Sequence, residues 1–243
     1  MSLRNFFLKS KLTYKIYLYY NLLIRHKALV KRKYYSQWGE DLEIFKYFKN
    51  KKKGNYLDIG CFHPIMYSNT YLLYQKGWRG INIDLNQTSI DLFNIMRPND
   101  INLCRAIGST KKFVKVFFDS HFSPVNTIDS GFYKKQKKTF FKKKFERLVK
   151  VESIKNIINK NKNNKFFDFI NIDAEGMDFK ILSKINLKSL KTSMVAIETH
   201  HFDGKKTKDY LKIINFLKKY KFILKKRFGP TSLFVKNSLM KNI

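Results

Sequence analysis

The sequence predicts an α/β fold: a doubly wound, mostly parallel seven-stranded sheet with an antiparallel hairpin at one edge. Short apolar segments alternate with helical patterns over most of the chain. Near its end, two apolar segments flank Gly229-Pro230, a turn signal that predicts a hairpin. The 243 residues are enough for one well-buried domain with an appendage.

Seven segments are predicted to form the sheet because they are short, apolar and bounded by turn residues. They are 55–60, 79–85, 101–107, 166–172, 194–197, 221–227 and 231–236. Phe113 to Phe118 is predicted as an added strand or hairpin arm, and 119–150 is the least regular region.

Capping residues and apolar spacing place helices between these strands. Ser68 or Asn69 is a natural N-cap, and Gly77 is a stop signal for the same helix. The predicted helices are 36–50, 68–76, 88–96, 153–161, 177–185 and 206–219.

The charge distribution divides the chain. Residues 1–33 hold nine Lys or Arg and no acid, and they are predicted to form a basic N-terminal helical appendage. Residues 34–243 are predicted to be the main domain, with a lysine-rich insertion near 119–150. Residues 3–30 have the pattern of a basic amphipathic helix on an anionic membrane surface; a helix packed on the core is the alternative.

The formal net charge of +32 has two explanations. Basic surfaces attract nucleic acid, anionic lipid or acidic polysaccharide. The abundance of Lys, Asn, Ile, Phe and Tyr is also what an AT-rich genome produces. Nucleic acid is the less favoured partner because the basic segments contain no regular recognition motif. A nucleic-acid-binding protein is still one function that this charge would suit.

Cysteine content and hydropathy predict the cellular compartment of the protein. The only cysteines, Cys61 and Cys104, do not suggest a disulfide framework, so a reducing compartment fits. No stretch reaches the roughly 18–20 apolar residues that span a bilayer, and no small-residue cleavage site follows Tyr14 to Ile24. The sequence predicts a cytoplasmic protein, either free or peripheral on the inner face of the membrane.

Polar groups follow four predicted strands and should meet in one crevice, because parallel strands present their carboxyl ends at the same edge. These groups are Asp58 to His63, Asp84, Asp173 with Glu175, and Glu198 with His200. The first turn has one glycine where a dinucleotide site has three, which argues against a pyrophosphate. A ribose-containing ligand without phosphate, S-adenosylmethionine, fits better, and its positive sulfonium favours nearby carboxylates.

A set of short motifs occurs in a fixed order. The motifs are 35–41 (YSQWGED), 57–60 (LDIG) with His63-Pro64, 68–70 (SNT), 77–81 (GWRGI), 97–100 (RPND) and 172–176 (IDAEG). With them the chain resembles the FkbM family of S-adenosylmethionine-dependent methyltransferases over about residues 34–236. The resemblance implies a Rossmann-like, class I methyltransferase fold and O-methylation, typically of a hydroxyl on a sugar in a glycan or on a small molecule.

The resemblance also implies roles for strand-end residues. Asp58, Gly60 and Cys61 would surround the methionyl part of the cofactor. Asp84, where the family more commonly has glutamate, would hold the ribose. The remaining predicted cofactor-binding residues are His63, Asn86, Ala106 and Ile107.

Methyl transfer to a hydroxyl benefits from a base that takes its proton as the new bond forms. Asp173 is the favoured catalytic residue, with His200 and Glu198 as alternatives. These three side chains could also bind a divalent cation. Their spacing matches no diagnostic metal motif, so no metal is predicted. A nucleic-acid-binding protein or nucleic-acid methyltransferase that uses the basic surface is the alternative function, and a catalytically silent binding module is a third possibility.

Overall fold

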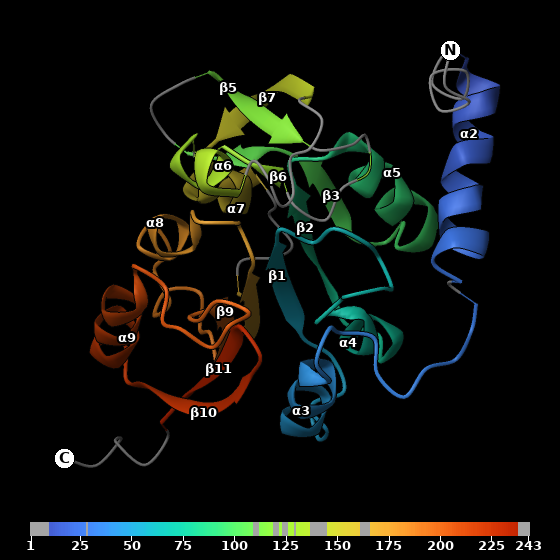
Figure 1. Ribbon diagram of the computed structural model, residues 1–243. Coiled ribbons are helices and arrows are strands. Elements are labelled where there is room, and N and C mark those ends of the chain that lie inside the picture. Colours follow the sequence, from blue (N-terminus) through green and yellow to red (C-terminus); the bar gives the residue numbers. More distant parts are fainter. Residues whose placement is uncertain are drawn as a thin grey trace.

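The fold is built on one seven-stranded sheet, which runs through the centre of the computed structural model (Figure 1). The structure describes residues 10–27, 29–108, 112–118, 122, 126–128, 130–136, 145–160 and 166–237. The strand order is β10-β11-β9-β8-β1-β2-β3. The strands are β1 (Asn55–Ile59), β2 (Arg79–Asp84), β3 (Ile101–Cys104), β8 (Phe169–Ile172), β9 (Met194–Glu198), β10 (Phe222–Phe228) and β11 (Thr231–Lys236).

Strand direction confirms the predicted sheet. β1 pairs in parallel with both β2 and β8, and parallel pairing continues to β3 on one side and β9 on the other. β11 is antiparallel to β9 and to β10, which gives the predicted hairpin at one edge. The chain leaves β1 first toward β2 and later returns to β8. The strand order therefore reverses between β1 and β8, the place where open α/β sheets bind ligands.

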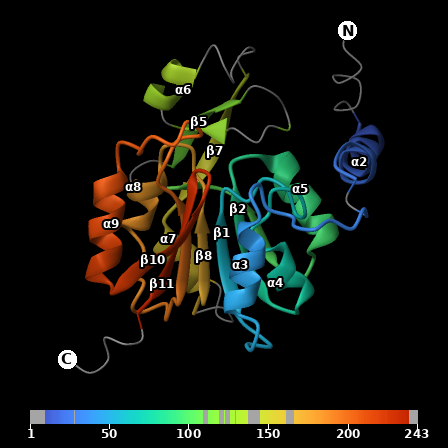
Figure 2. The same cartoon turned by 60° about the horizontal axis from the view of Figure 1, so that its bottom comes forward.

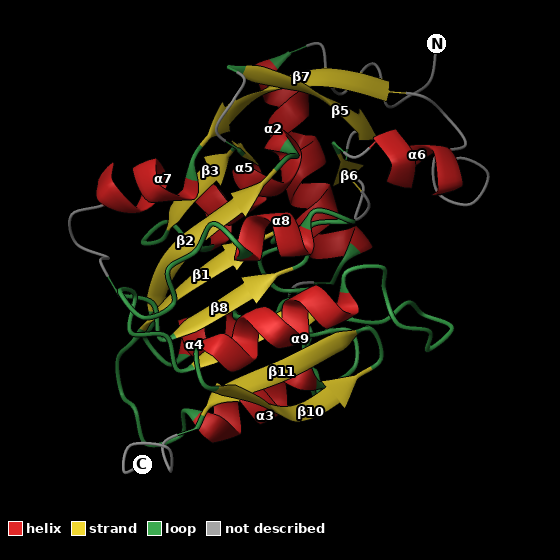
Figure 3. Cartoon of the chain, turned by 90° about the vertical axis from the view of Figure 1, so that its left-hand side faces the viewer, coloured by secondary structure: helices red, strands yellow, loops and turns green. Residues whose placement is uncertain are grey.

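Helices cover both faces of the sheet, as Figures 2 and 3 show. Those on one face are α3 (Glu40–Tyr47), α4 (Tyr71–Gln75) and α5 (Gln87–Met96); those on the other are α7 (Ile154–Lys160), α8 (Asp178–Leu182) and α9 (Tyr210–Lys219). Strand alternation explains this arrangement. In β1, Leu57 and Ile59 join the core that packs on α7, α8 and α9, whereas Tyr56 joins the core that includes α3 and α4.

A second, four-stranded sheet has the order β4-β7-β5-β6. Its strands are β4 (Ala106–Ile107), β5 (Phe113–Phe118), β6 (Asn126–Thr127) and β7 (Phe145–Glu152); α6 (Ser130–Gln136) follows β6. The predicted strand 101–107 is therefore two strands, because β4 pairs with β7 instead of continuing the main sheet. The eight-residue β7 was not predicted; its antiparallel pairing with β5 supplies the partner of the added strand. Much of the lysine-rich insertion, including 137–144, lies outside the described residues.

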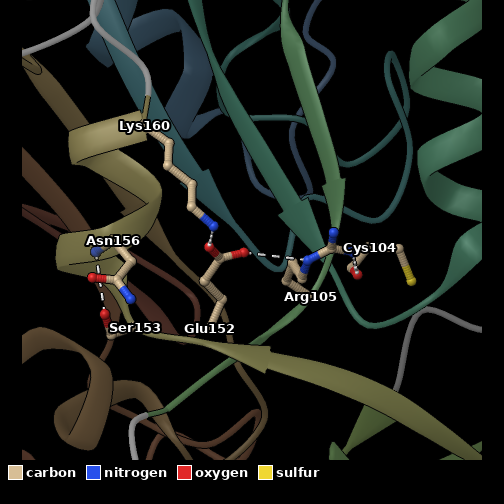
Figure 4. A network of polar contacts seen from close by, with 6 residues as sticks. All are labelled: Cys104, Arg105, Glu152, Ser153, Asn156 and Lys160. Carbon is tan, nitrogen blue, oxygen red and sulfur yellow. Dashed lines mark hydrogen bonds and ion pairs between the residues drawn. The ribbon is translucent and has the colours of Figure 1, made fainter. Parts of the chain in front are cut away.

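A polar network lies where the two sheets join. Figure 4 shows Glu152, at the end of β7, between Arg105 and Lys160. The Arg105 Nε to Glu152 Oε2 distance is 3.4 Å. Hydrogen bonding to Lys160 is the main reason that the pKa of Glu152 is lowered. Arg105 occupies the break between β3 and β4, so this contact attaches the second sheet to the main one.

The N-terminal segment packs against α5. Helix α2 (Lys11–Tyr19) begins at the cap residue Ser10 and continues into one π-helical turn, η1 (Tyr20–Arg25). Leu18 and Leu22 are buried in a cluster that includes Leu92 of α5. No helix in the described part of the chain is long and apolar enough to cross a membrane.

Arg97 follows α5 and is fully buried. Its guanidinium donates to Thr70 Oγ1 at 2.8 Å, to Ser68 Oγ at 2.9 Å and to the Pro64 carbonyl. It also lies over the Phe93 ring, 4.9 Å from its centre. The loop after β1 is thus fastened to the end of α5 through one side chain, which is a geometry that the planar, five-donor guanidinium permits.

We expect Arg97→Met to lower the free energy of unfolding by about 3–5 kcal/mol. The variant removes a buried positive charge that offsets the nearby carboxylate of Asp58, and it leaves the hydroxyls of Ser68 and Thr70 without their donor. Urea titration followed by circular dichroism measures the change. The control, Arg227→Met, alters an exposed side chain of β10 and should stay within about 0.5 kcal/mol of wild type. Equal stability of the two variants would contradict this role of Arg97.

Candidate active site

A cavity of about 270 Å³ opens at the carboxyl ends of the parallel strands, where the strand order reverses. Its lining comes from the ends of β1, β2, β8 and β9, from the start of α3, and from β4 and β6 of the second sheet. Eight of the eleven predicted site residues line it: Asp58, Gly60, Cys61, Asp84, Ile107, Asp173, Glu198 and His200. The expectation that these strand ends meet is therefore confirmed in space.

Three predicted residues lie elsewhere. His63 is buried beside His26, with 4.7 Å between ring centres, and its Nδ1 accepts from the backbone N–H of Met66. Asn86 caps α5 by accepting from the Thr88 N–H at 2.9 Å. Ala106 is buried in the core of the second sheet. None of the three lines the cavity, so we assign them structural positions.

Gly60 permits the tight crossing between the loops that follow β1 and β8. Its φ is +81°, and a Cβ at this position would lie 1.7 Å from the carbonyl oxygen of Asp173. Any side chain would therefore force the two loops apart. The glycine is required by the fold of the site as much as by a ligand.

Asp84, at the end of β2, fixes two neighbouring loops. Its Oδ2 accepts from the Phe62 N–H at 2.9 Å and its Oδ1 from the Asn86 N–H at 2.6 Å. Burial raises the pKa of this carboxyl to about 6. Each oxygen keeps a further lone pair, so Asp84 can both hold the loops and accept hydrogen bonds from ribose hydroxyls.

Asp58 is more deeply integrated into the protein. Its two oxygens accept from the Asn171 amide at 2.9 Å and from the Thr70 hydroxyl at 2.7 Å. Burial raises its pKa. These bonds join β1 to β8 and to the loop held by Arg97.

Three further carboxylates line the cavity and have no partner in the described part of the chain. Asp173 and Glu175 follow β8, and Glu198 ends β9; we refer to the three as the carboxylate cluster. No hydrogen bond or ion pair to their side-chain oxygens occurs among the described residues. Burial raises the pKa of Asp173 to about 7 and that of Glu175 and Glu198 well above the usual range. Repulsion by Asp178 adds to the effect at all three, and repulsion by Asp173 adds to it at the two glutamates.

Backbone contacts hold this cluster in place. Glu175 has a φ of +47°, an uncommon conformation for a residue with a side chain. The Thr127 hydroxyl of β6 donates to its carbonyl at 3.0 Å. Asp178, the first residue of α8, accepts from the N–H groups of Ala174 and Gly176. The second sheet and α8 therefore jointly fix the turn, which is a common property of strained functional loops.

His200 lies beside the cluster on the segment after β9. Its Nδ1 is 2.8 Å from the Thr199 hydroxyl, which is itself 2.6 Å from the Ser232 hydroxyl of β11. Burial, reinforced by the charges of Arg227 and Lys206, lowers its pKa. The imidazole is therefore neutral at pH 7 and able to accept a proton.

Several lining residues were not predicted as site residues. The nearest to the cluster in character is Glu40, which is buried at the start of α3 and accepts from the Trp38 N–H at 2.8 Å. An acid at a helix start suggests a simple capping role, so its sequence gave no signal of a cavity position. The others used below are Gln37, Tyr67, Asn69, Arg105 and Phe202.

Comparison with known proteins identifies the family. A family model described as the methyltransferase FkbM domain matches residues 50–224, more than half of the chain. The chain belongs to the FkbM methyltransferase family. It is an S-adenosylmethionine-dependent methyltransferase with a Rossmann-like, class I fold, as the resemblance of its motifs implied. No curated protein matches it.

Two solved structures are distantly similar to this FkbM-family chain. A TehB-like S-adenosylmethionine-dependent methyltransferase from Corynebacterium glutamicum is 12% identical, with 92% of this chain and 97% of that chain covered and a TM-score of 0.42. A structure of WbdD is 15% identical, with 82% of this chain but only 34% of that chain covered and a TM-score of 0.38. Likenesses this distant say nothing about the acceptor.

The cavity of this methyltransferase suits its cofactor. Asp84 offers acceptors for the ribose, and the apolar side chains of Leu85 and Ile107 border the same region. The unpaired carboxylate cluster suits a positive sulfonium or amino group. Within the described ranges, no group of three or more His, Cys, Asp or Glu side chains is arranged to hold a metal ion.

We expect Glu198→Gln to stabilise the cofactor-free protein at pH 8. In the unfolded chain these carboxyls ionise near pH 4, whereas in the folded protein that of Asp173 keeps its proton to about pH 7. Stability should therefore fall as the pH rises through this window, and removing one like charge should recover at least about 1 kcal/mol at pH 8.

Thermal unfolding at pH 8 and pH 5 checks this prediction. At pH 5 the wild-type cluster is largely protonated, so the variant should gain little there. The control, Glu43→Gln, breaks an ion pair with Lys225 outside the cavity and should not stabilise the protein at either pH. The same gain at both pH values would show that repulsion is not its cause.

Proposed function

We propose that this enzyme transfers the methyl group of S-adenosylmethionine to a hydroxyl oxygen of a sugar, in a glycan, a glycoconjugate or a small glycoside. The observation that carries the proposal is the composition of the cavity mouth. Tyr67 and Phe202 line the cavity yet are 48% and 67% exposed. Exposed aromatic rings beside a cavity indicate a binding surface, and they suit the C–H faces of a pyranose.

Neutral amides accompany these rings. Gln37 and Asn69 line the cavity, and the buried Oδ1 of Asn69 has no hydrogen-bond partner among the residues described. Amide groups can donate to and accept from sugar hydroxyls. Rings and amides at one cavity mouth are the combination that a neutral, hydroxyl-rich acceptor requires.

The reaction needs a positioned oxygen and a base. The cofactor supplies the methyl group on a positively charged sulfur. We assign the proton acceptor to Asp173: as the acceptor oxygen bonds to the methyl carbon, the carbon–sulfur bond would break with its electron pair staying on sulfur, and the carboxylate would take the hydroxyl proton. A pKa near 7 suits a group that must be ionised before transfer and protonated after it. Glu198 and His200 are the alternative bases.

The charge of the cavity argues against a nucleic acid in the site. Among the described residues, six acidic side chains line it, against one arginine, Arg105. A phosphate backbone entering this cavity would meet strong repulsion. We therefore disfavour the alternative of a nucleic-acid methyltransferase, in spite of the net charge of +32.

A panel of simple methyl glycosides and oligosaccharides, with labelled S-adenosylmethionine, tests the acceptor class. We expect transfer to at least one sugar hydroxyl. Asp173→Asn should lower the transfer rate by about 10²–10⁴-fold, the usual contribution of a general base, while leaving S-adenosylhomocysteine binding within severalfold of wild type. Asp203→Asn, a change at an exposed acid paired with Lys205, is the control. Transfer to a protein or RNA but to no sugar would refute the acceptor class.

We also propose that the N-terminal segment contacts an anionic membrane. One side of α2 and η1 is buried through Leu18 and Leu22, but the other side exposes a row of apolar residues. These are Leu12, Ile16, Tyr19, Tyr20, Leu23 and Ile24. Exposed basic residues accompany them: Lys11, Lys15, Arg25, Lys27, Lys31 and Lys33. Apolar and basic groups on one exposed surface suit an anionic bilayer. On this proposal the enzyme acts in the cytoplasm, at the inner face of the membrane.

Replacing Ile16 and Leu23 together by Asp should abolish binding to vesicles that contain phosphatidylglycerol. Each apolar side chain contributes about 1.5–3 kcal/mol when it leaves water, so the loss should exceed tenfold. Co-sedimentation with anionic and with pure phosphatidylcholine vesicles measures it. Leu211→Asp changes an exposed leucine on α9 and should bind like wild type. Equal binding by all three proteins would refute the contact.

A further inference from the structure

The charged residues that line the cavity are mostly acidic, whereas those of the whole sequence are mostly basic. The sequence has 50 Lys and Arg against 18 Asp and Glu, yet the described residues that line the cavity include six acids and a single arginine. Three of the six, Asp58, Asp84 and Glu40, accept hydrogen bonds from protein groups that hold them in place. The carboxylate cluster of Asp173, Glu175 and Glu198 has no such bond within the described residues.

Within the residues that the structure describes, no cationic side chain is paired with this cluster. Asp178 of α8 repels all three of its members, and Asp58 of β1 and Glu40 of α3 add to the repulsion at Asp173. Asp84 of β2 acts in the same direction. Elsewhere in the described lining of the cavity, Arg105 forms an ion pair with Glu152. The other basic residues there are His200 and His201.

We infer that the carboxylate cluster distinguishes the two forms of the cofactor by their charge. It releases a proton when the sulfonium of S-adenosylmethionine binds, and it therefore favours the methyl donor over the demethylated product. The two ligands share the adenosyl and amino-acid groups and differ by one methyl group and one positive charge. A neutral product gives the cluster no reason to ionise. The inference rests on the cofactor class and is independent of the acceptor.

The proton balance follows from electrostatics. Without ligand, the cluster reduces its repulsion by keeping a proton, and the pKa of Asp173, about 7, leaves that proton half bound at neutral pH. A sulfonium beside it favours the ionised form, so the proton leaves to the buffer as the ligand enters. S-adenosylhomocysteine carries no such charge and should leave the proton in place.

Calorimetric titration of the wild-type protein at pH 7, in two buffers of different ionisation enthalpy, tests the exchange. We expect release of roughly half a proton to one proton for each S-adenosylmethionine bound, and close to none for S-adenosylhomocysteine. Sinefungin, which carries an amine in place of the methylated sulfur, should behave like the donor. Equal proton release for all three ligands would overturn the inference.

Substitutions locate the effect. Glu198→Gln and Glu175→Gln should each weaken S-adenosylmethionine binding at least about tenfold and S-adenosylhomocysteine binding less than about threefold, because only the first ligand presents a charge. Glu43→Gln, outside the cavity, should change neither affinity. An equal loss of affinity for both ligands in the cluster variants would show that these residues shape the cavity and do not respond to the charge of the ligand. That result would overturn the inference.

Discussion

The site depends on one buried guanidinium. After β1 the chain must turn so that Cys61 and Phe62 line the cavity while His63 turns into the core. Arg97 fixes that turn through hydrogen bonds to the Pro64 carbonyl and to the hydroxyls of Ser68 and Thr70 farther along the loop. One of these hydroxyls, that of Thr70, also donates to Asp58 in the central strand. The strand, the loop and the helix end are therefore joined through one side chain.

This arrangement changes the meaning of several motifs. His63-Pro64, Ser68 to Thr70 and Arg97 occur in the order typical of the family, and in the structure they lie around the same guanidinium. We assign His63-Pro64, Ser68, Thr70 and Arg97 to building the site, whereas Asn69, within the same motif, also lines the cavity. Arg97, the buried arginine of the described chain, bonds to the loop and not to the carboxylate cluster. Stability and charge compensation are thus separated in space, as is common where a functional site carries strain.

The sequence predicted the seven-stranded sheet and the convergence of its acidic strand ends because both follow from local pattern and from parallel strand geometry. It did not predict side-chain direction. Phe62 has a φ of +44°, and this turn sends His63 into the core although it lies at the expected strand end. The break at Arg105 was invisible because β4 is a strand only through its pairing with β7. In β7 itself, basic residues obscured the alternation of Val149 and Val151.

The proposed general base and the inferred proton release involve the same carboxylate, that of Asp173. When the methyl donor is bound, its charge favours the loss of a proton from the cluster, so the ionised fraction of Asp173 is highest when there is a methyl group to transfer. When the methyl group leaves the sulfur with the bonding pair left behind, the sulfur would become neutral, and the same carboxylate would take the proton of the acceptor hydroxyl. The negative charge of the cluster and the positive charge of the ligand are thereby lost together. The cavity then holds a neutral product next to a protonated carboxyl, the protonation state that the cluster favours without ligand. Nothing electrostatic retains the product, and the next donor must again displace a proton to enter.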